Sequence, residues 1–231
     1  MRLLLTNDDG FGAEGIEILR RLASKISSEI WVVAPSRDRS GSSRSMTLRT
    51  PIAVNKLTER EFAVDGTPSE CVVIALHELM KFPPDLILSG INSGSNIGAD
   101  VGCSGTVGAA LEGALFKIPS IALSQRYSDK TLPTNWEVAK NHTLPIIKSL
   151  LNSDWDPSIV MNINFPDVLE VKGTKFVKQG RHFDLNDLSC HTDDNGRQFF
   201  VINGNRPAIG DGSVEAVQQG FIAITPIKSD F

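Results

Sequence analysis

Short apolar runs alternate with segments of helical period along the first half of the chain. Four runs are rich in leucine, isoleucine and valine, which is typical of strands buried on both faces. They are Arg2–Thr6, Ile30–Ala34, Asp85–Ser89 and Ile121–Ser124. Three segments between or near them carry apolar residues every three or four positions and predict helices. These are Gly15–Ser24, Val72–Met80 and Val107–Phe116, the last with small residues on one side. The order of elements indicates an α/β fold with a mainly parallel, doubly wound sheet.

The pattern changes near Val171. From there, strand-like runs at Gln198–Ile202 and Gly220–Thr225 are separated by asparagine, aspartate and glycine, which favour turns. We therefore predict a β-rich C-terminal extension over residues 171–231, within a single α/β domain of 231 residues. The polar stretch Arg181–Arg197 is expected to form an exposed loop or arm.

Composition limits the partners and the compartment. An apolar fraction of 41% can fill one sizeable core, and a formal net charge of −4 gives no basic field that would attract nucleic acid or an anionic membrane. No apolar run is long enough to span a bilayer. The three cysteines lie far apart without metal-finger spacing, so we expect a reducing cytoplasm. Any nucleotide must then be held by local contacts.

Two adjacent carboxylates follow the first predicted strand. Asp8 and Asp9 stand at its carboxyl end, which is the edge where ligands bind in open α/β sheets. Two such groups repel each other unless a cation or a proton lies between them, and oxygen ligands suit Mg²⁺ or Mn²⁺. The alternative is that the Asp-Asp-Gly segment only forms a turn and caps the helix that begins near Gly15.

Three further loops carry candidate ligands. Segment 36–44 is rich in serine and arginine, which suit a metal or a phosphate, although a solvated loop has the same composition. After the third strand, Asn92 offers a neutral oxygen ligand. Ser104 and Thr106 flank Gly105 at a helix start, where free N–H groups bind anions, or where a hydroxyl simply caps the helix.

The expected meeting of these loops at one sheet edge indicates a function. A metal held by carboxylates, facing a phosphate held by backbone amides, fits a phosphomonoesterase better than any other simple chemistry. A deacetylase-type hydrolase is a rival, but it normally adds histidine ligands, and none lies near Asp8, Asn92 or Ser104 in the sequence. A non-catalytic module that senses nucleotide or phosphate would use the same loops without releasing phosphate.

Motifs spread along the chain resemble those of the SurE family of nucleotidases. They are Leu4-Leu5-Thr6-Asn7-Asp8-Asp9-Gly10, Val33-Ala34-Pro35, Arg39-Ser40-Gly41, Gly66-Thr67-Pro68, Ser89-Gly90-Ile91-Asn92, Ser104-Gly105-Thr106-Val107 and the closing segment Ala216–Pro226. The resemblance covers nearly the whole chain. Cys103 departs from the pattern, because many relatives carry an aromatic residue at this position, and this leaves the base or sugar preference open.

The resemblance implies a site, substrates and an assembly. The implied ligands of one divalent cation, Mg²⁺ or Mn²⁺, are Asp8, Asp9, Ser40 and Asn92. The implied phosphate-binding residues are Asn96, Ser104, Gly105 and Thr106, with the Ser40 hydroxyl as a further candidate. It also implies a Rossmann-like core, hydrolysis of nucleoside 5′- or 3′-monophosphates and, in some members, of short polyphosphate. The expected assembly is a homodimer or homotetramer that exchanges C-terminal segments.

Two mechanisms are compatible with an acidic pair after a first strand. We expect a metal-activated water to attack phosphorus in line with the leaving ribose oxygen, with Asp8, Asp9 and Asn96 as catalytic residues and Asp8 orienting the water. The rival is a covalent aspartyl-phosphate. Phosphatases of that kind usually carry a second acid two residues further on, where this chain has Gly10. The water-based route is therefore favoured.

Overall fold

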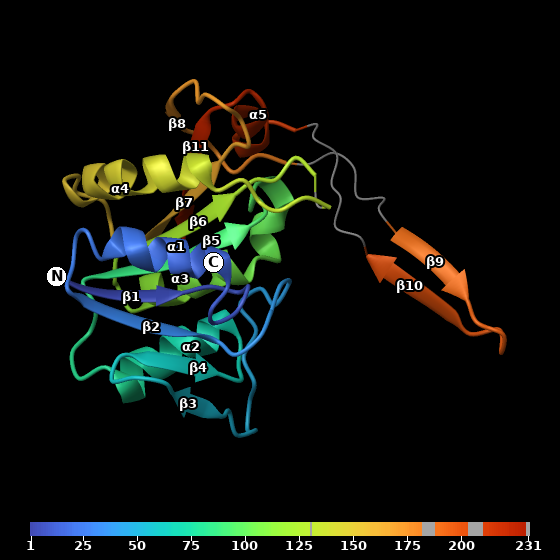
Figure 1. Ribbon diagram of the computed structural model, residues 1–231, viewed down its shortest axis with the longest axis horizontal. Coiled ribbons are helices and arrows are strands. Elements are labelled where there is room, and N and C mark those ends of the chain that lie inside the picture. Colours follow the sequence, from blue (N-terminus) through green and yellow to red (C-terminus); the bar gives the residue numbers. More distant parts are fainter. Residues whose placement is uncertain (130, 182–187, 203–209, 230–231) are drawn as a thin grey trace.

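A nine-stranded, mostly parallel sheet forms the centre of the molecule in the computed structural model, which describes residues 1–129, 131–181, 188–202 and 210–229 (Figure 1). The strand order is β3-β4-β2-β1-β5-β6-β7-β11-β8. The strands are β1 (Arg2–Thr6), β2 (Glu29–Pro35), β3 (Val54–Lys56), β4 (Glu61–Val64), β5 (Leu86–Ser93), β6 (Ser120–Gln125), β7 (Ile159–Phe165), β8 (Thr174–Phe176) and β11 (Ile222–Lys228). Neighbours from β4 to β7 run parallel, whereas β3 and β11 are antiparallel to β4 and β7.

Helices cover both faces of this sheet. They are α1 (Glu14–Ala23), α2 (Pro68–Ile74), α3 (Gly105–Leu115), α4 (Glu137–Leu151) and α5 (Ser213–Gln218). Alternate residues of β1 enter different cores, because successive side chains of a strand point to opposite faces. Leu3 and Leu5 pack in the core that includes α1 and α4, and Leu4 packs in the core that includes α2. The doubly wound α/β prediction is confirmed.

The predicted elements of the first half are present with small changes at their ends. Each of the four predicted strands overlaps an observed central strand. The predicted helix Val72–Met80 begins earlier, at Pro68, and continues as a π-helical turn over Ala75–Leu79. Thr67 sets this earlier start, because its side chain accepts the backbone N–H of Glu70 while the Glu70 carboxylate accepts the N–H of Thr67.

The C-terminal region is rich in strands, as predicted, and it also contains a helix, α5. Two of its strands, β8 and β11, join the central sheet. The stretch expected as an exposed loop or arm contains a strand, β9 (Leu188–Thr192), whereas residues 182–187 of it lie outside the described part. Strand β9 pairs antiparallel with β10 (Gln198–Ile202), which confirms the predicted strand there.

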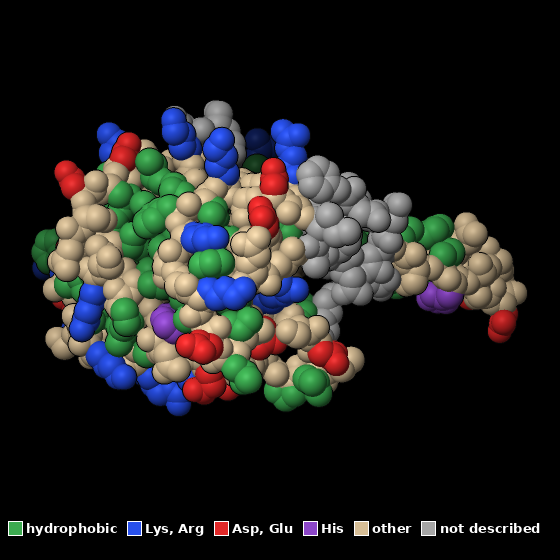
Figure 2. Space-filling view, turned by 90° about the horizontal axis from the view of Figure 1, so that it is seen from above, with side chains coloured by type: hydrophobic (Ala, Val, Ile, Leu, Met, Phe, Trp, Pro, Cys, Tyr) green, Lys and Arg blue, Asp and Glu red, His purple; other side chains and the backbone are tan. Residues whose placement is uncertain are grey.

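The β9–β10 hairpin projects away from the sheet and its helices (Figure 1). Hydrophobic side chains lie on its surface, clear of the body (Figure 2). Among them, Ile202 is 82% exposed, and Leu188 and Phe200 are each 59% exposed. Among the described residues, no helix combines the length and the apolar character that crossing a bilayer requires.

Candidate active site

The loops predicted to converge do meet around the acidic turn after β1. The N–H of Arg39, from the serine-rich loop, donates to the Asp8 carbonyl at 2.8 Å. The N–H of Ser93, at the end of β5, donates to Oδ2 of Asp9 at 3.1 Å. The Thr106 hydroxyl, in the first turn of α3, donates to Oδ1 of Asp8 at 2.5 Å. Side chains far apart in the sequence therefore share one site at the carboxyl edge of the sheet.

The Asp8 carboxylate lies at the amino terminus of α3. Its side chain is 4% exposed, and this burial raises the pKa of its carboxyl group. Hydrogen bonds from the Thr106 hydroxyl and from the backbone N–H groups of Asp8 and Thr106 act in the opposite direction. The Ser104 hydroxyl accepts the Val107 N–H at 3.1 Å and so caps the helix. The group that the helix start contacts is therefore the carboxyl of Asp8 itself.

Gly105 permits this close approach. A Cβ atom at this position would lie 2.9 Å from Cβ of Asp8 and 2.8 Å from the Ser42 hydroxyl oxygen. Real Cβ atoms do not come so close to such atoms, so any side chain here would displace Asp8 or the serine-rich loop. The Ser-Gly-Thr motif is therefore explained by packing between α3 and the acidic turn.

Asp9 lies beside Asp8 and is less buried. Burial, and then the negative charge of Asp8, raise the pKa of Asp9 to about 7, while the Ser93 N–H acts against this shift. In the described chain, no basic side chain pairs with either carboxylate, since Arg37 and Arg39 contact Asp65 instead. A divalent cation would relieve this repulsion, and the acidic pair therefore fits one.

The other two predicted metal ligands present oxygens suited to this cation. Ser40 is exposed, and its hydroxyl donates to Oδ1 of Asp38 at 2.6 Å, which leaves its oxygen able to bind a metal. The Asn92 amide nitrogen donates to the Gly94 carbonyl at 2.8 Å, so its Oδ1 is the atom left for a ligand role. No group of three or more His, Cys, Asp or Glu in the described ranges could hold a metal, so the mixed set is the candidate.

The side chain of Asn96 lies at the same site. Its amide donates to the Ser124 hydroxyl at 2.8 Å and, more weakly, to the Thr106 hydroxyl oxygen at 3.4 Å. Asn96 is 7% exposed. It thus lies one hydrogen bond beyond Thr106, which itself contacts Asp8.

The serine-rich loop is anchored rather than free in solvent. Arg44 pairs with the buried Glu112 of α3 at 3.0 Å. The Thr67 hydroxyl donates to the Ser45 carbonyl at 2.8 Å, and Glu70 accepts the Thr47 N–H. The Gly66-Thr67-Pro68 motif therefore holds this loop against the start of α2. The arginines expected to supply positive charge to the site are engaged in these and other ion pairs.

Sequence reasoning missed several residues of this site. The Asp38 charge contributes to the raised pKa of Asp8 and of Asp9. Tyr127, the single tyrosine of the chain, follows β6 and lies against Gly94. Its pKa is raised by burial and then by the nearby charges of Asp100 and Asp9. Position after a strand is a signal that could have identified Tyr127. Asn162 and Asn164 of β7 were missed as well, although two asparagines in an apolar run are unusual.

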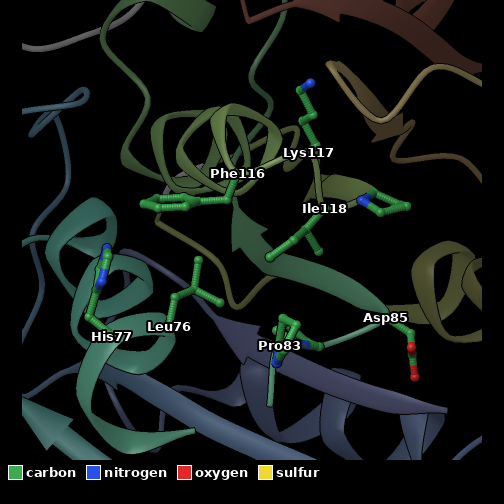
Figure 3. Close-up of a pocket in the computed structure, with 9 residues that line it drawn as sticks. Leu76, His77, Pro83, Asp85, Phe116, Lys117 and Ile118 are labelled. Atoms are coloured by element: carbon green, nitrogen blue, oxygen red, sulfur yellow. The ribbon is translucent and has the colours of Figure 1, made fainter. Parts of the chain in front are cut away.

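A separate cavity of about 500 Å³ lies at the carboxyl end of α3 and the start of β5 (Figure 3). The acidic turn contacts the opposite ends of these two elements, and none of the predicted site residues lines this cavity. His77 lies in its wall with its ring 5.4 Å from that of Phe116 in an edge-on arrangement. This contact gives His77 a packing role in the cavity wall.

Fold and site together define the class: an α/β protein with a carboxylate pair and a helix amino terminus at the carboxyl edge of a doubly wound sheet. The family model described as "Survival protein SurE" matches residues 3–184. This chain belongs to the SurE family.

Similar proteins of known name agree with this assignment. The chain is 47% identical to the 5′-nucleotidase SurE of Wolbachia pipientis wMel over 233 residues, which cover 100% of this chain and 91% of the relative. It is also 47% identical to the 5′-nucleotidase SurE of Ehrlichia ruminantium (strain Welgevonden), covering 100% and 94%. Among solved structures, the SurE protein from Aquifex aeolicus is similar, with a TM-score of 0.83, 32% identity and coverage of 100% and 94%.

Proposed function

We propose that this chain is a metal-dependent 5′-nucleotidase that hydrolyses nucleoside monophosphates to nucleoside and phosphate. The observation that carries the proposal is the contact between Thr106, at the start of α3, and the buried Asp8 carboxylate, with Asp9 beside it. A phosphate and a cation would meet at such a point. The relatives named 5′-nucleotidase SurE, which match over the whole chain, support the substrate class.

The proposed ligands of the cation, Mg²⁺ or Mn²⁺, are Asp8, Asp9, Ser40 and Asn92. When bound, such a cation supplies positive charge for phosphoryl transfer and lowers the pKa of a water molecule. The carboxylate pair without a basic partner in the described chain supports this role.

The remaining steps depend on the chain's own groups. The Thr106 hydroxyl fixes Oδ1 of Asp8, so the carboxylate is oriented before substrate binds and can direct the attacking water. We assign the substrate phosphate to the surroundings of Asn96 and the Ser104–Thr106 turn. Because Asp8 occupies the helix start, we assign the phosphate to the solvent side of this carboxylate.

The finer activities are proposed by extension. Recognition of the substrate through phosphate and cation contacts would be compatible with nucleoside 3′-monophosphates and short polyphosphate. The exposed Cys103, just before Ser104, stands where a base or sugar could approach. The three unpaired cysteines support a reducing compartment such as the cytoplasm.

We further propose that the chain forms a homodimer or homotetramer through its C-terminal hairpin. The support is the apolar surface of β9 and β10, which the body of the same chain leaves exposed (Figure 2). An exchanged hairpin would bury these side chains against a second copy.

The deciding experiment is a phosphate-release screen with purified protein. Nucleoside 5′- and 3′-monophosphates and short polyphosphate are each assayed with Mg²⁺, with Mn²⁺ and with EDTA. We expect metal-dependent release from 5′-monophosphates and its loss with EDTA. Nucleotide binding without release, measured by calorimetry, would instead identify a sensor module and overturn the proposal.

A further inference from the structure

Two buried asparagines lie next to each other on one face of β7. Asn162 and Asn164 are both 0% exposed, and their spacing of two residues places both side chains on the same face of the strand. A buried amide is unfavourable unless its polar atoms are hydrogen-bonded. The hydrogen-bond partners of the two amides therefore indicate the role of these asparagines.

Both side chains bind the backbone of a single residue, Asn96. Oδ1 of Asn164 accepts the Asn96 N–H at 2.7 Å, and Nδ2 of Asn164 donates to the Asn96 carbonyl at 3.1 Å. Nδ2 of Asn162 donates to the same carbonyl at 2.9 Å. Asn164 alone thus satisfies both backbone polar groups of Asn96, as a neighbouring strand would do.

The side chain of Asn96 points in turn toward the acidic turn. Its amide donates to Ser124 and Thr106, and Thr106 donates to Asp8. A continuous set of hydrogen bonds therefore runs from β7 through Asn96 to the carboxylate at the centre of the site. Neither Asn162 nor Asn164 contacts that carboxylate directly in these hydrogen bonds.

We propose that Asn164 is a positioning residue of the active site, which fixes the Asn96 backbone so that the Asn96 amide holds the Thr106 hydroxyl in place against the Asp8 carboxylate. This inference rests on the nucleotidase function proposed above. Without the Asn164 side chain, the buried N–H of Asn96 loses its partner, and the residue must shift to find another. Removing a group that orients a site residue typically costs roughly 10- to 100-fold in activity or affinity.

The test compares Asn164→Leu with a matched control, Thr225→Val. Thr225 lies on β11, is 1% exposed, and its hydroxyl has no hydrogen-bond partner. Thr225 faces Asn162 across the β7–β11 pair, so its replacement alters an equally buried polar position in the same part of the sheet while removing no hydrogen bond to Asn96. We expect kcat/KM to fall roughly 10- to 100-fold in Asn164→Leu, and to stay near the wild-type value in Thr225→Val. Asn162→Leu should have a smaller effect, because both contacts of Asn164 with the Asn96 backbone remain when Asn162 is replaced.

A double-substitution cycle separates positioning from general destabilisation. If Asn164 acts through Asn96, adding Asn164→Leu to Asn96→Ala should cost no further activity, although thermal stability falls again. Multiplying losses of activity in the double variant would overturn the inference. If Asn164→Leu does not fold, Asn164→Asp keeps the size and the Oδ1 acceptor but loses the amide donor, and the same cycle is run with it.

Binding of inorganic phosphate with Mn²⁺, measured by calorimetry on the folded variants, provides a readout that does not need catalysis. We expect the phosphate Kd to rise about tenfold or more in the Asn164 variant, and to stay unchanged in Thr225→Val. An unchanged Kd in the Asn164 variant would overturn the positioning role. A wild-type protein that releases no phosphate from any substrate would instead overturn the nucleotidase proposal, and the phosphate Kd would still test Asn164.

Discussion

Polar side chains are usually exposed and apolar side chains are usually buried. The active-site edge departs from the first rule and the β9–β10 hairpin from the second. At the sheet edge, polar groups such as Asp8, Asn96 and Asn164 are buried, whereas on the hairpin apolar groups such as Phe200 and Ile202 are exposed. The buried polar groups are hydrogen-bonded within the same chain. The exposed apolar groups contact solvent. The buried polar groups therefore find their partners within one chain, whereas the exposed apolar groups of the hairpin would be buried only by a second copy.

The largest effect should come from the centre of the buried edge. We expect Asp8→Asn to lower kcat/KM on the order of a thousandfold, or about 4 kcal/mol, because it removes a charged oxygen ligand while keeping the shape of the side chain. Phosphate release with Mn²⁺ measures this, and circular dichroism verifies the fold. Asp156→Asn, at an exposed carboxylate in the loop before β7, is the control and should stay active. Near-normal activity of Asp8→Asn would remove the basis of the proposed site.

A change of intermediate size is expected at the hairpin. Replacing Phe200 and Ile202 by aspartate together should dissociate the assembly, because charges would replace apolar surface at the proposed contact. Light scattering after size-exclusion chromatography would show the lower mass. Leu169→Asp is the control, since Leu169 is fully exposed and apolar but lies outside the hairpin. If the double variant kept the wild-type mass, the hairpin would not be the contact.

The last prediction concerns the stability of the metal-free protein and not its activity. The pKa of Asp9 is raised to about 7 in the folded chain, against about 4 in an unfolded chain. Between these values the unfolded chain has lost the proton and the folded chain still holds it. The metal-free protein should therefore lose stability as pH rises from about 4 to about 7 and level off above.

Urea unfolding in EDTA across this pH range measures the effect. Asp9→Asn, which has no carboxyl at this position, should show a flatter dependence on pH than the wild type. Equal slopes in the two proteins would contradict the raised pKa of Asp9.

The sequence allowed the buried strands with continuous apolar runs to be predicted, but not the elements whose apolar pattern is interrupted. Strands β1 and β5 were recognised because each contains a run of three apolar residues, 3–5 and 86–88, that is fully buried between the two layers of helices. Strand β7 was missed, because Asn162 and Asn164 interrupt its apolar pattern. Helix α4 was missed as well, and Pro145 lies within it.

The same limit applies to the site. Asp8, Asp9 and Thr106 were named because strand ends and helix starts can be recognised locally, and the structure brings them together. The partners of Asn96 could not be named, since they depend on β7 lying beside β6 in space. The contact of the helix start with Asp8 could not be named either, since it depends on Gly105 letting the acidic turn approach.

Strand β11 enters the sheet between β7 and β8, although it follows both of them and the hairpin in the sequence. A nascent chain on the ribosome therefore exposes the edge of β7 until residues 222–228 have emerged. The apolar hairpin is made before that strand, so it is displayed while the sheet is still unfinished. During translation, the unpaired edge of β7 and the apolar surface of the hairpin are thus exposed at the same time. Chaperones would be most needed in this interval, because both surfaces favour aggregation.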